Sequence, residues 1–246
     1  MTMVTDTDLY ARGAATLVAS WEEYARGSSG ARVTRLPGAA AAVFPSGPER
    51  EFYNNALVER DLDPEGRCRA LDAIAAAYAA AGVTGYAVWV HESDAGMRRE
   101  SERRGGRLVE TTRVMGMALA GIRVPRPASG VEPADWREYL RVADLPPGLL
   151  AAVDPAAFHV VVGRLDGEIA AAGIAYDAGG DCGIYNVVTR EHARRRGLGT
   201  AVTAALVHDA RSRGCRTASL QSTPMAERVY AAVGFRDLGR FLEYAP

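Results

Sequence analysis

Apolar positions along the chain follow two alternating patterns. Over residues 9–26 and 64–82 they recur every three or four residues, which predicts amphipathic helices. Short runs rich in β-branched and aromatic residues, such as residues 85–91, instead predict strands. Because the two patterns alternate along the chain, we predict an α/β fold in which helices are layered on a mixed sheet.

Glycine, proline and polar residues between these runs set the expected bounds of the elements. Strands are expected at residues 33–44 (as a pair), 51–59, 85–91, 107–119, 158–164, 168–176, 183–189, 216–221 and 235–244. Helices are expected at residues 9–26, 64–82, 94–104, 136–142, 200–213 and 225–233. Residues 121–134 contain Pro125, Pro127 and Pro133 and are expected to form a linker.

Both halves of the chain repeat one order of elements: strand, helix, strand, short helix and strand. In the first half this order covers residues 51–119, and in the second half it covers residues 183–244. We interpret the halves as two copies of one α/β unit in tandem, residues 1–125 and residues 126–246. The alternative is that any α/β chain shows such alternation without an internal repeat.

The composition narrows the classes of protein to consider. Of the 246 residues 48% are hydrophobic and the formal net charge is −1, which gives no general attraction to nucleic acids or acidic membranes. No apolar run approaches the ~18 residues of a membrane span, and no leader pattern is present, so a cytoplasmic protein is expected. The three cysteines lack the spacing of metal ligands, so free thiols and no metal site are expected.

Residues 183–213 carry the clearest chemical signal in the chain. A β-rich run leads through an arginine-dense turn to Gly197 and Gly199, and then into a helix rich in Ala and Val. This order directs backbone N–H groups and the positive end of a helix dipole at one point, where an anion such as a phosphate can bind. The alternative is an ordinary helix start with solvated arginines around it.

Three phosphate-binding patterns compete for this turn. The P-loop pattern requires a lysine, and the chain contains none. The dinucleotide pattern G-x-G-x-x-G requires a third small residue where Val202 stands. The pattern R-x-x-G-x-G is satisfied by Arg194, Arg195, Arg196, Gly197, Leu198 and Gly199.

At this turn the chain resembles the GNAT superfamily of N-acetyltransferases. The R-x-x-G-x-G pattern lies between a strand and a helix, as in that family, and Ala226, Tyr230 and Gly234-Phe235 match its downstream A-x-x-x-Y-x-x-x-G-F pattern. The match covers residues 155–246, whereas the first half is similar only in its order of elements. The resemblance implies two GNAT-like mixed-sheet domains in tandem, the first without a pyrophosphate loop.

The resemblance also implies a reaction, the direct transfer of an acetyl group from acetyl-CoA to an amine of a small molecule or peptide. The backbone of Val187, Val188 and Thr189 would bind the pantetheine arm, while Thr200 and the six residues of the R-x-x-G-x-G turn would hold the pyrophosphate. Tyr230 would act as the general acid that protonates the leaving thiolate, the alternative being an aromatic core residue. The general base stays open: Glu168 and Asp181 are the carboxylates nearest in sequence, and a water relay is an equal alternative.

The first half differs at the corresponding turn, where Asp61, Asp63 and Glu65 would repel a pyrophosphate. One acetyl-CoA site is therefore expected, in the second half of the chain. Two functions are consistent with this pattern: an acetyltransferase, or a non-catalytic acyl-CoA-binding or regulatory module. A role in binding nucleic acid is disfavoured, because the arginines are not interleaved with aromatic residues.

Overall fold

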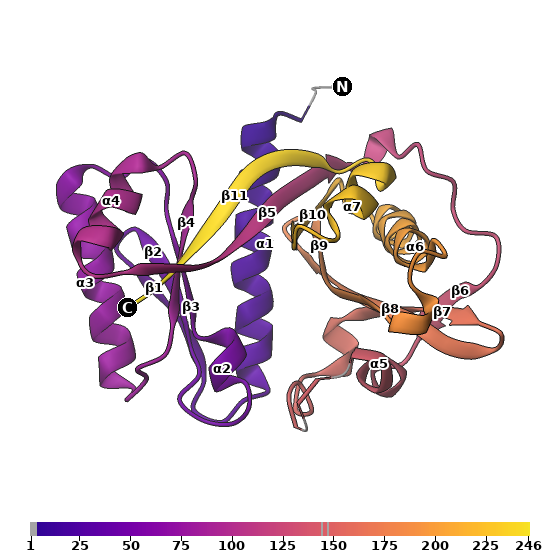
Figure 1. Ribbon diagram of the computed structural model, residues 1–246, viewed down its shortest axis with the longest axis horizontal. Helices are drawn as coiled ribbons and strands as arrows, with labels where there is room; N and C mark the ends of the chain where they lie inside the picture. Colours follow the sequence, from indigo (N-terminus) through magenta and orange to yellow (C-terminus); the bar gives the residue numbers. More distant parts are fainter. Residues whose placement is uncertain (1–3, 144, 147) are drawn as a thin grey trace. The chain divides into compact units, whose positions relative to one another are not determined.

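The computed structural model describes residues 4–143, 145, 146 and 148–246 (Figure 1). The chain divides into two units, each built from segments that are distant in sequence. Unit 1 comprises Met1–Leu17, Arg113–Leu145 and Asp154–Leu238, and unit 2 comprises Val18–Thr112, Pro146–Val153 and Gly239–Pro246. Helix α1 (Asp6–Arg26) and strands β5 (Arg107–Ala118) and β11 (Arg236–Ala245) contribute residues to both units.

Each unit contains hydrogen-bonded strands in a mixed order, with helices on their faces. In unit 2 the order is β1-β2-β3-β4-β11, and in unit 1 it is β5-β10-β9-β8-β7-β6. The remaining strands are β1 (Arg32–Leu36), β2 (Ala39–Val43), β3 (Asn55–Val58), β4 (Ala87–His91), β6 (Val131–Ala134), β7 (His159–Leu165), β8 (Glu168–Ala178), β9 (Asp181–Thr189) and β10 (Thr217–Ser222). The expected α/β architecture with a mixed sheet is confirmed. No helix of the described residues is both long and apolar enough to cross a lipid bilayer.

Unit 2 has its main core between the strands and helices α3 (Pro64–Ala80) and α4 (Ala95–Arg103). Helix α3 begins where Asp63 accepts a hydrogen bond from the Gly66 N–H, with Pro64 in the first turn. On the other face of the strands, the ring of Trp21 from α1 meets that of Trp89 from β4 edge-on, with centroids 5.7 Å apart. Both faces of this sheet are therefore covered by apolar contacts.

The structure corrects two expectations about local elements. Residues 51–59 were expected to form one strand, but helix α2 (Arg50–Tyr53) precedes β3, because the Asn54 side chain bonds the N–H and C=O of Phe44 and holds the chain in a bend. The expected linker at residues 121–134 ends in strand β6, which pairs with β7. Pro133 is compatible with this strand because β6 lies at the edge of the strand order. A proline there, which lacks an N–H, does not interrupt the hydrogen bonds between strands.

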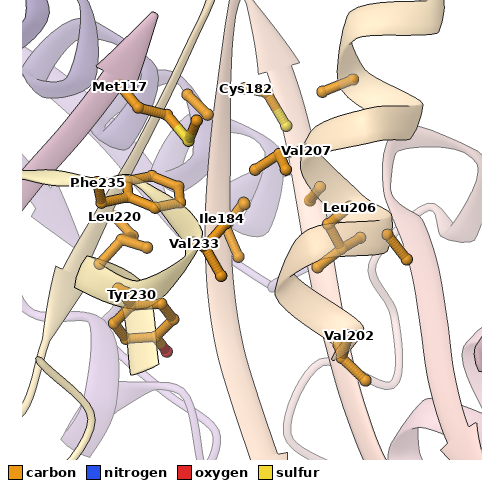
Figure 2. Close-up of a cluster of buried hydrophobic side chains, with 14 of the residues drawn as sticks. Met117, Cys182, Ile184, Val202, Leu206, Val207, Leu220, Tyr230, Val233 and Phe235 are labelled. Carbon is orange, nitrogen blue, oxygen red and sulfur yellow. The ribbon is translucent and has the colours of Figure 1, made fainter. Parts of the chain in front are cut away.

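In unit 1, helices α6 (Leu198–Ser212) and α7 (Glu227–Val233) share one hydrophobic core with the strands (Figure 2). Gly173 of β8 allows α6 to approach closely, since a Cβ at this position would lie 3.0 Å from Val202 and 3.2 Å from Leu206. The opposite face carries helix α5 (Trp136–Ala143) and a row of rings in which Phe158 lies 5.3 Å from Trp136 and 5.4 Å from Tyr176. The packing fixes both the strand β9 and the helix α6 that follows it.

The last strand of each expected copy pairs with strands of the other copy. Strand β5 closes the first copy in sequence, but its residues pair with β10 of unit 1, from Thr217↔Ala118 to Ser222↔Arg113. Strand β11 closes the second copy in sequence, but its residues pair with β4 of unit 2, from Phe241↔His91 to Tyr244↔Val88. The order of elements along the chain does not predict this exchange of closing strands, because local sequence patterns do not determine which distant strands pair.

Candidate functional site

The neighbouring parallel strands β9 and β10 separate partway along their length. Their pairing is confined to Thr217↔Asp181, Ala218↔Cys182 and Ser219↔Gly183. Beyond this point β10 continues beside β5 and β9 continues beside β8, with a register shift where Asn186 adopts φ of 50°. A gap therefore opens between the carboxyl ends of the two strands, which is where α/β sheets bind ligands.

The edge of β9 that faces this gap carries backbone groups able to bind an extended ligand. Arg190 N–H donates to Ala170 O on β8, and main-chain groups alternate in direction along an antiparallel strand. The N–H of Thr189 therefore points away from β8, toward the gap. The three strand residues singled out in the sequence, Val187, Val188 and Thr189, all lie on this final segment of β9.

The closed end of the gap is held by a buried carboxylate. Asp181 is 1% exposed and accepts hydrogen bonds of 2.6 Å from the hydroxyls of Thr217 and Ser219. These bonds link β9 and β10 where they are still paired. Asp181 thus lies away from the open end and is not placed to act as a base there, while Glu168 is exposed at the start of β8.

The turn after β9 presents a row of free backbone donors. It contains the short helix η3 (Glu191–Ala193) and two left-handed residues, Arg195 with φ of 62° and Gly197 with φ of 80°. In the described part of the chain, no N–H from residue 195 to residue 200 donates a hydrogen bond, because the first bond of α6 runs from Ala201 N–H to Gly197 O. Alternating left- and right-handed residues that turn successive N–H groups to one side form an anion-binding concavity.

Positive charge adds to these donors. Among the described residues, none of Arg194, Arg195 and Arg196 forms an ion pair, and all three are exposed. Arg194 uses its Nε to donate to Thr189 O at 3.3 Å, which ties the turn to the end of β9. Helix α6 begins at Leu198, two residues before the expected start, so that Leu198, Gly199 and Thr200 form its first turn and direct the positive end of the helix dipole to this point.

Three elements meet around Gly199. A Cβ on this residue would lie 3.6 Å from Thr189 Oγ1 at the end of β9 and 3.7 Å from Val229 Cγ1 in α7. The next residue of α7 is Tyr230, which was singled out in the sequence. The structure therefore brings together the end of β9, the glycine turn and the start of α7, all at the open end of the gap.

Tyr230 combines a buried ring with a free hydroxyl. The side chain is 7% exposed, and its ring lies beside Phe235 and Leu220 with the oxygen directed away from them (Figure 2). Within the described residues the hydroxyl forms no hydrogen bond, and burial raises the pKa of Tyr230 to about 12. The phenol is therefore fully protonated at neutral pH and can donate its proton to a group that becomes strongly basic.

Two features of this site were not predicted from the sequence. The separation of β9 from β10 depends on which partners each strand chooses, and the left-handed backbone of Arg195 is not indicated by its residue type. The expected turn, by contrast, was visible because glycines and arginines cluster between a strand pattern and a helix pattern. The chemical character of the site could therefore be predicted from the sequence, whereas its shape could not.

Comparisons with known proteins identify the family of this chain. A family model described as Acetyltransferase (GNAT) family matches residues 108–235. A comparison with curated protein sequences found no significant match. Among solved structures, the chain is similar to a GCN5-related N-acetyltransferase from Kribbella flavida, with 20% identity, a TM-score of 0.71 and 94% of each chain covered.

Two further solved structures are similar over most of the chain. A GCN5-related N-acetyltransferase from Sphaerobacter thermophilus has 19% identity and a TM-score of 0.58, with 85% of this chain and 80% of that chain covered. A GCN5-related N-acetyltransferase-like protein from Streptococcus suis has 16% identity and a TM-score of 0.56, with 94% of this chain and 96% of that chain covered. At these identities the likeness establishes a shared fold, and that fold includes the first half of the chain.

Proposed function

Because this chain belongs to the GNAT family of acetyltransferases, we propose that the gap between β9 and β10 holds the pantetheine arm of acetyl-CoA. Membership assigns the protein its reaction, the transfer of an acetyl group from acetyl-CoA to an amine acceptor that is not identified. The single observation that carries the proposal is the loss of pairing beyond Ser219↔Gly183, which leaves the end of β9 with one strand neighbour. An extended amide ligand can take the place of the missing strand.

The segment from Val187 to Thr189 would bind the two amides of the pantetheine arm through the backbone of Val187 and Thr189, since by the same alternation Val188 directs its backbone groups to β8. The N–H of Thr189, which points toward the gap, is available to the thioester carbonyl. A donor fixed at this position would stabilise the negative charge that develops on the carbonyl oxygen when an amine attacks. The strand thus serves both to place the thioester and to polarise it.

The pyrophosphate would lie in the turn formed by Arg194, Arg195, Arg196, Gly197, Leu198, Gly199 and Thr200. Its oxygens would accept hydrogen bonds from the free N–H groups, and the arginines would balance its charge. Gly197 supports this arrangement because its φ of 80° is strained for any residue with a Cβ. No step of this binding requires a metal ion.

Tyr230 would act as the general acid. Attack of the neutral amine on the thioester forms the new C–N bond, and collapse of the intermediate breaks the C–S bond and releases a thiolate. The phenol of Tyr230, which is protonated at neutral pH, would transfer its proton to this sulfur, and the proton that the attacking nitrogen loses would pass to solvent while the phenolate regains one. Its free hydroxyl and its place next to Val229, which approaches Gly199, support this role.

We also propose that the chain is a tandem of GNAT-like domains, with residues 126–246 as the acetyl-CoA-binding domain and residues 1–125 as a degenerate copy. The parallel pair β3 and β4, joined by α3, corresponds in order to β9 and β10 joined by α6. At the start of α3, however, the Asp63 carboxylate occupies the N-terminus and would repel a phosphate.

The three cysteines are free thiols, which supports a reducing, cytoplasmic location.

Steady-state release of the CoA thiol tests this function. With acetyl-CoA and a panel of primary amines, the wild-type protein should release thiol continuously and in proportion to enzyme. The controls are the same reactions without amine and with N-acetylated amines, which have no nucleophilic nitrogen. Tight binding of acetyl-CoA without amine-dependent thiol release across the panel would instead identify a non-catalytic acyl-CoA-binding module.

A further inference from the structure

Unit 2 contains a cavity that the acetyl-transfer site does not use. It has a volume of about 830 Å³ and lies over β4, β5 and β11 on the side where α2 packs. Its polar and aromatic lining includes Phe52, Asn55, Trp89, Glu110, Thr112 and Glu243. All of these residues belong to unit 2, so the cavity is formed within that unit alone.

The main polar group of this cavity is a buried carboxyl. Glu243 lies in β11 directly opposite Trp89 of β4, so the two side chains occupy the same face of the sheet. Glu243 is only 8% exposed and forms no ion pair within the described residues. A carboxylate buried without a cation is costly, and the cost is recovered when a cation enters.

Thr112 provides a second, independent sign of a missing ligand. It is 8% exposed, it lines the cavity, and its hydroxyl forms no hydrogen bond of ordinary geometry in the described chain, although it lies close enough to Glu243 to lower the pKa of that carboxyl. Glu110 lies two residues earlier on the same strand and is exposed at the rim. A donor-rich group placed between these side chains would satisfy all three.

The other charged groups of the lining do not neutralise this pair. Arg50 directs its guanidinium to Gly82 O, to which it donates at 3.3 Å, and Glu51 adds a further negative charge at the exposed edge. Tyr86 stacks on Tyr78, with centroids 4.1 Å apart. The cavity therefore combines net negative charge with the aromatic surface of Trp89 and Phe52, which suits an organic cation.

We propose that this cavity is a binding site for an organic ammonium ion, held by the carboxylates of Glu243 and Glu110 and the hydroxyl of Thr112, with its apolar part against Trp89 and Phe52. The site is defined by unit 2 alone and goes beyond the acetyl-transfer site proposed above. An ammonium group supplies three N–H donors, and the three oxygen-bearing side chains supply three acceptors. No lysine of the protein can fill this role, since the chain has none.

Calorimetric titration with tyramine and tyrosol tests the proposal, because the two probes share a shape and differ in an ammonium against a hydroxyl group. At pH 8 tyramine should bind at least ~10-fold more tightly than tyrosol. Glu243→Gln should remove this preference and leave the weak binding of tyrosol unchanged. Glu65→Gln, which changes a carboxylate that is 81% exposed outside the cavity, is the matched control and should change neither.

The pH dependence of tyramine binding distinguishes a binding role of Glu243 from a purely structural one, which would not change the affinity with pH. Burial and the charge of Glu110 raise the pKa of Glu243 to about 7, so tyramine binding should strengthen by about 10-fold from pH 6 to pH 8. This step should vanish in Glu243→Gln. Equal affinities for tyramine and tyrosol, or a preference that survives both Glu243→Gln and Glu110→Gln, would overturn the proposal.

Thermal unfolding at two pH values completes the test. Folding raises the pKa of Glu243 from 4.5 to about 7, so ionisation of this carboxyl increasingly destabilises the folded protein as the pH rises above 4.5. Glu243→Gln removes this cost and should therefore have a higher Tm than wild type at pH 8 and an equal Tm at pH 4. An equal Tm at both pH values would show that the carboxyl is not buried in solution and would overturn the site.

Discussion

Replacing Gly199 with valine should raise the Kd for acetyl-CoA by about 100-fold while the folded protein stays as stable as wild type. A Cβ at this position meets Thr189 Oγ1 at 3.6 Å and Val229 Cγ1 at 3.7 Å, which are ordinary van der Waals contacts. The φ of Gly199 is not left-handed, and valine is a better helix former than glycine, so α6 is not destabilised. The added methyl groups would instead occupy the path of the pantetheine arm between β9 and the pyrophosphate turn.

The measurement is a calorimetric titration with acetyl-CoA, combined with thermal unfolding of the same variant. Gly121→Val is the matched control, because a Cβ on Gly121 would meet no atom within 4 Å and the residue lies outside the turn. This control should leave both the Kd and the Tm unchanged. An unchanged Kd in Gly199→Val would show that the ligand does not pass between these elements.

Replacing Tyr230 with phenylalanine should lower kcat by about 100- to 1000-fold with an accepted amine and leave the Kd for acetyl-CoA unchanged. The hydroxyl forms no hydrogen bond in the described chain, so its removal breaks no bond of the folded state, and the ring keeps its contact with Phe235. The substitution would slow the departure of the thiolate, because the sulfur no longer receives a proton from the phenol. Single-turnover kinetics with acetyl-CoA and the amine measure this step directly.

Tyr78→Phe provides the matched control in the other unit. The Tyr78 hydroxyl is buried and donates to Ala42 O at 2.9 Å, so its removal should cost about 1 kcal/mol of unfolding free energy and leave kcat unchanged. The two variants thus make opposite predictions for stability and for turnover. If Tyr230→Phe kept wild-type kcat, Tyr230 would be an aromatic core residue and another group, or water, would protonate the thiolate.

Local sequence patterns were sufficient to predict the elements that carry the site. Glycines between an arginine cluster and an Ala-rich run predicted the turn and helix α6, and a helix was expected at residues 225–233, where α7 lies. These signals depend on neighbouring residues, since glycine determines backbone freedom and apolar spacing determines which side of a helix is buried. The helix start was placed two residues late because Leu198 and Gly199 were assigned to the turn.

Features set by distant contacts could not be predicted in this way. The exchange of β5 and β11 and the separation of β9 from β10 both depend on which strand edges meet, and many pairings satisfy the same apolar alternation. The buried carboxyl of Glu243 was missed for a related reason. In the sequence it is an ordinary glutamate in a closing strand, and only its pairing opposite Trp89 places it in a cavity.

The central claim is that the chain holds one acetyl-CoA, in the turn after β9, and that the carboxylate at the start of α3 excludes a second. Calorimetric titration of the wild-type protein with acetyl-CoA measures this number directly. We predict one equivalent per chain, fully displaced by CoA. Two equivalents per chain would show that the first half also binds the donor, and the absence of binding would contradict the assignment of the gap between β9 and β10.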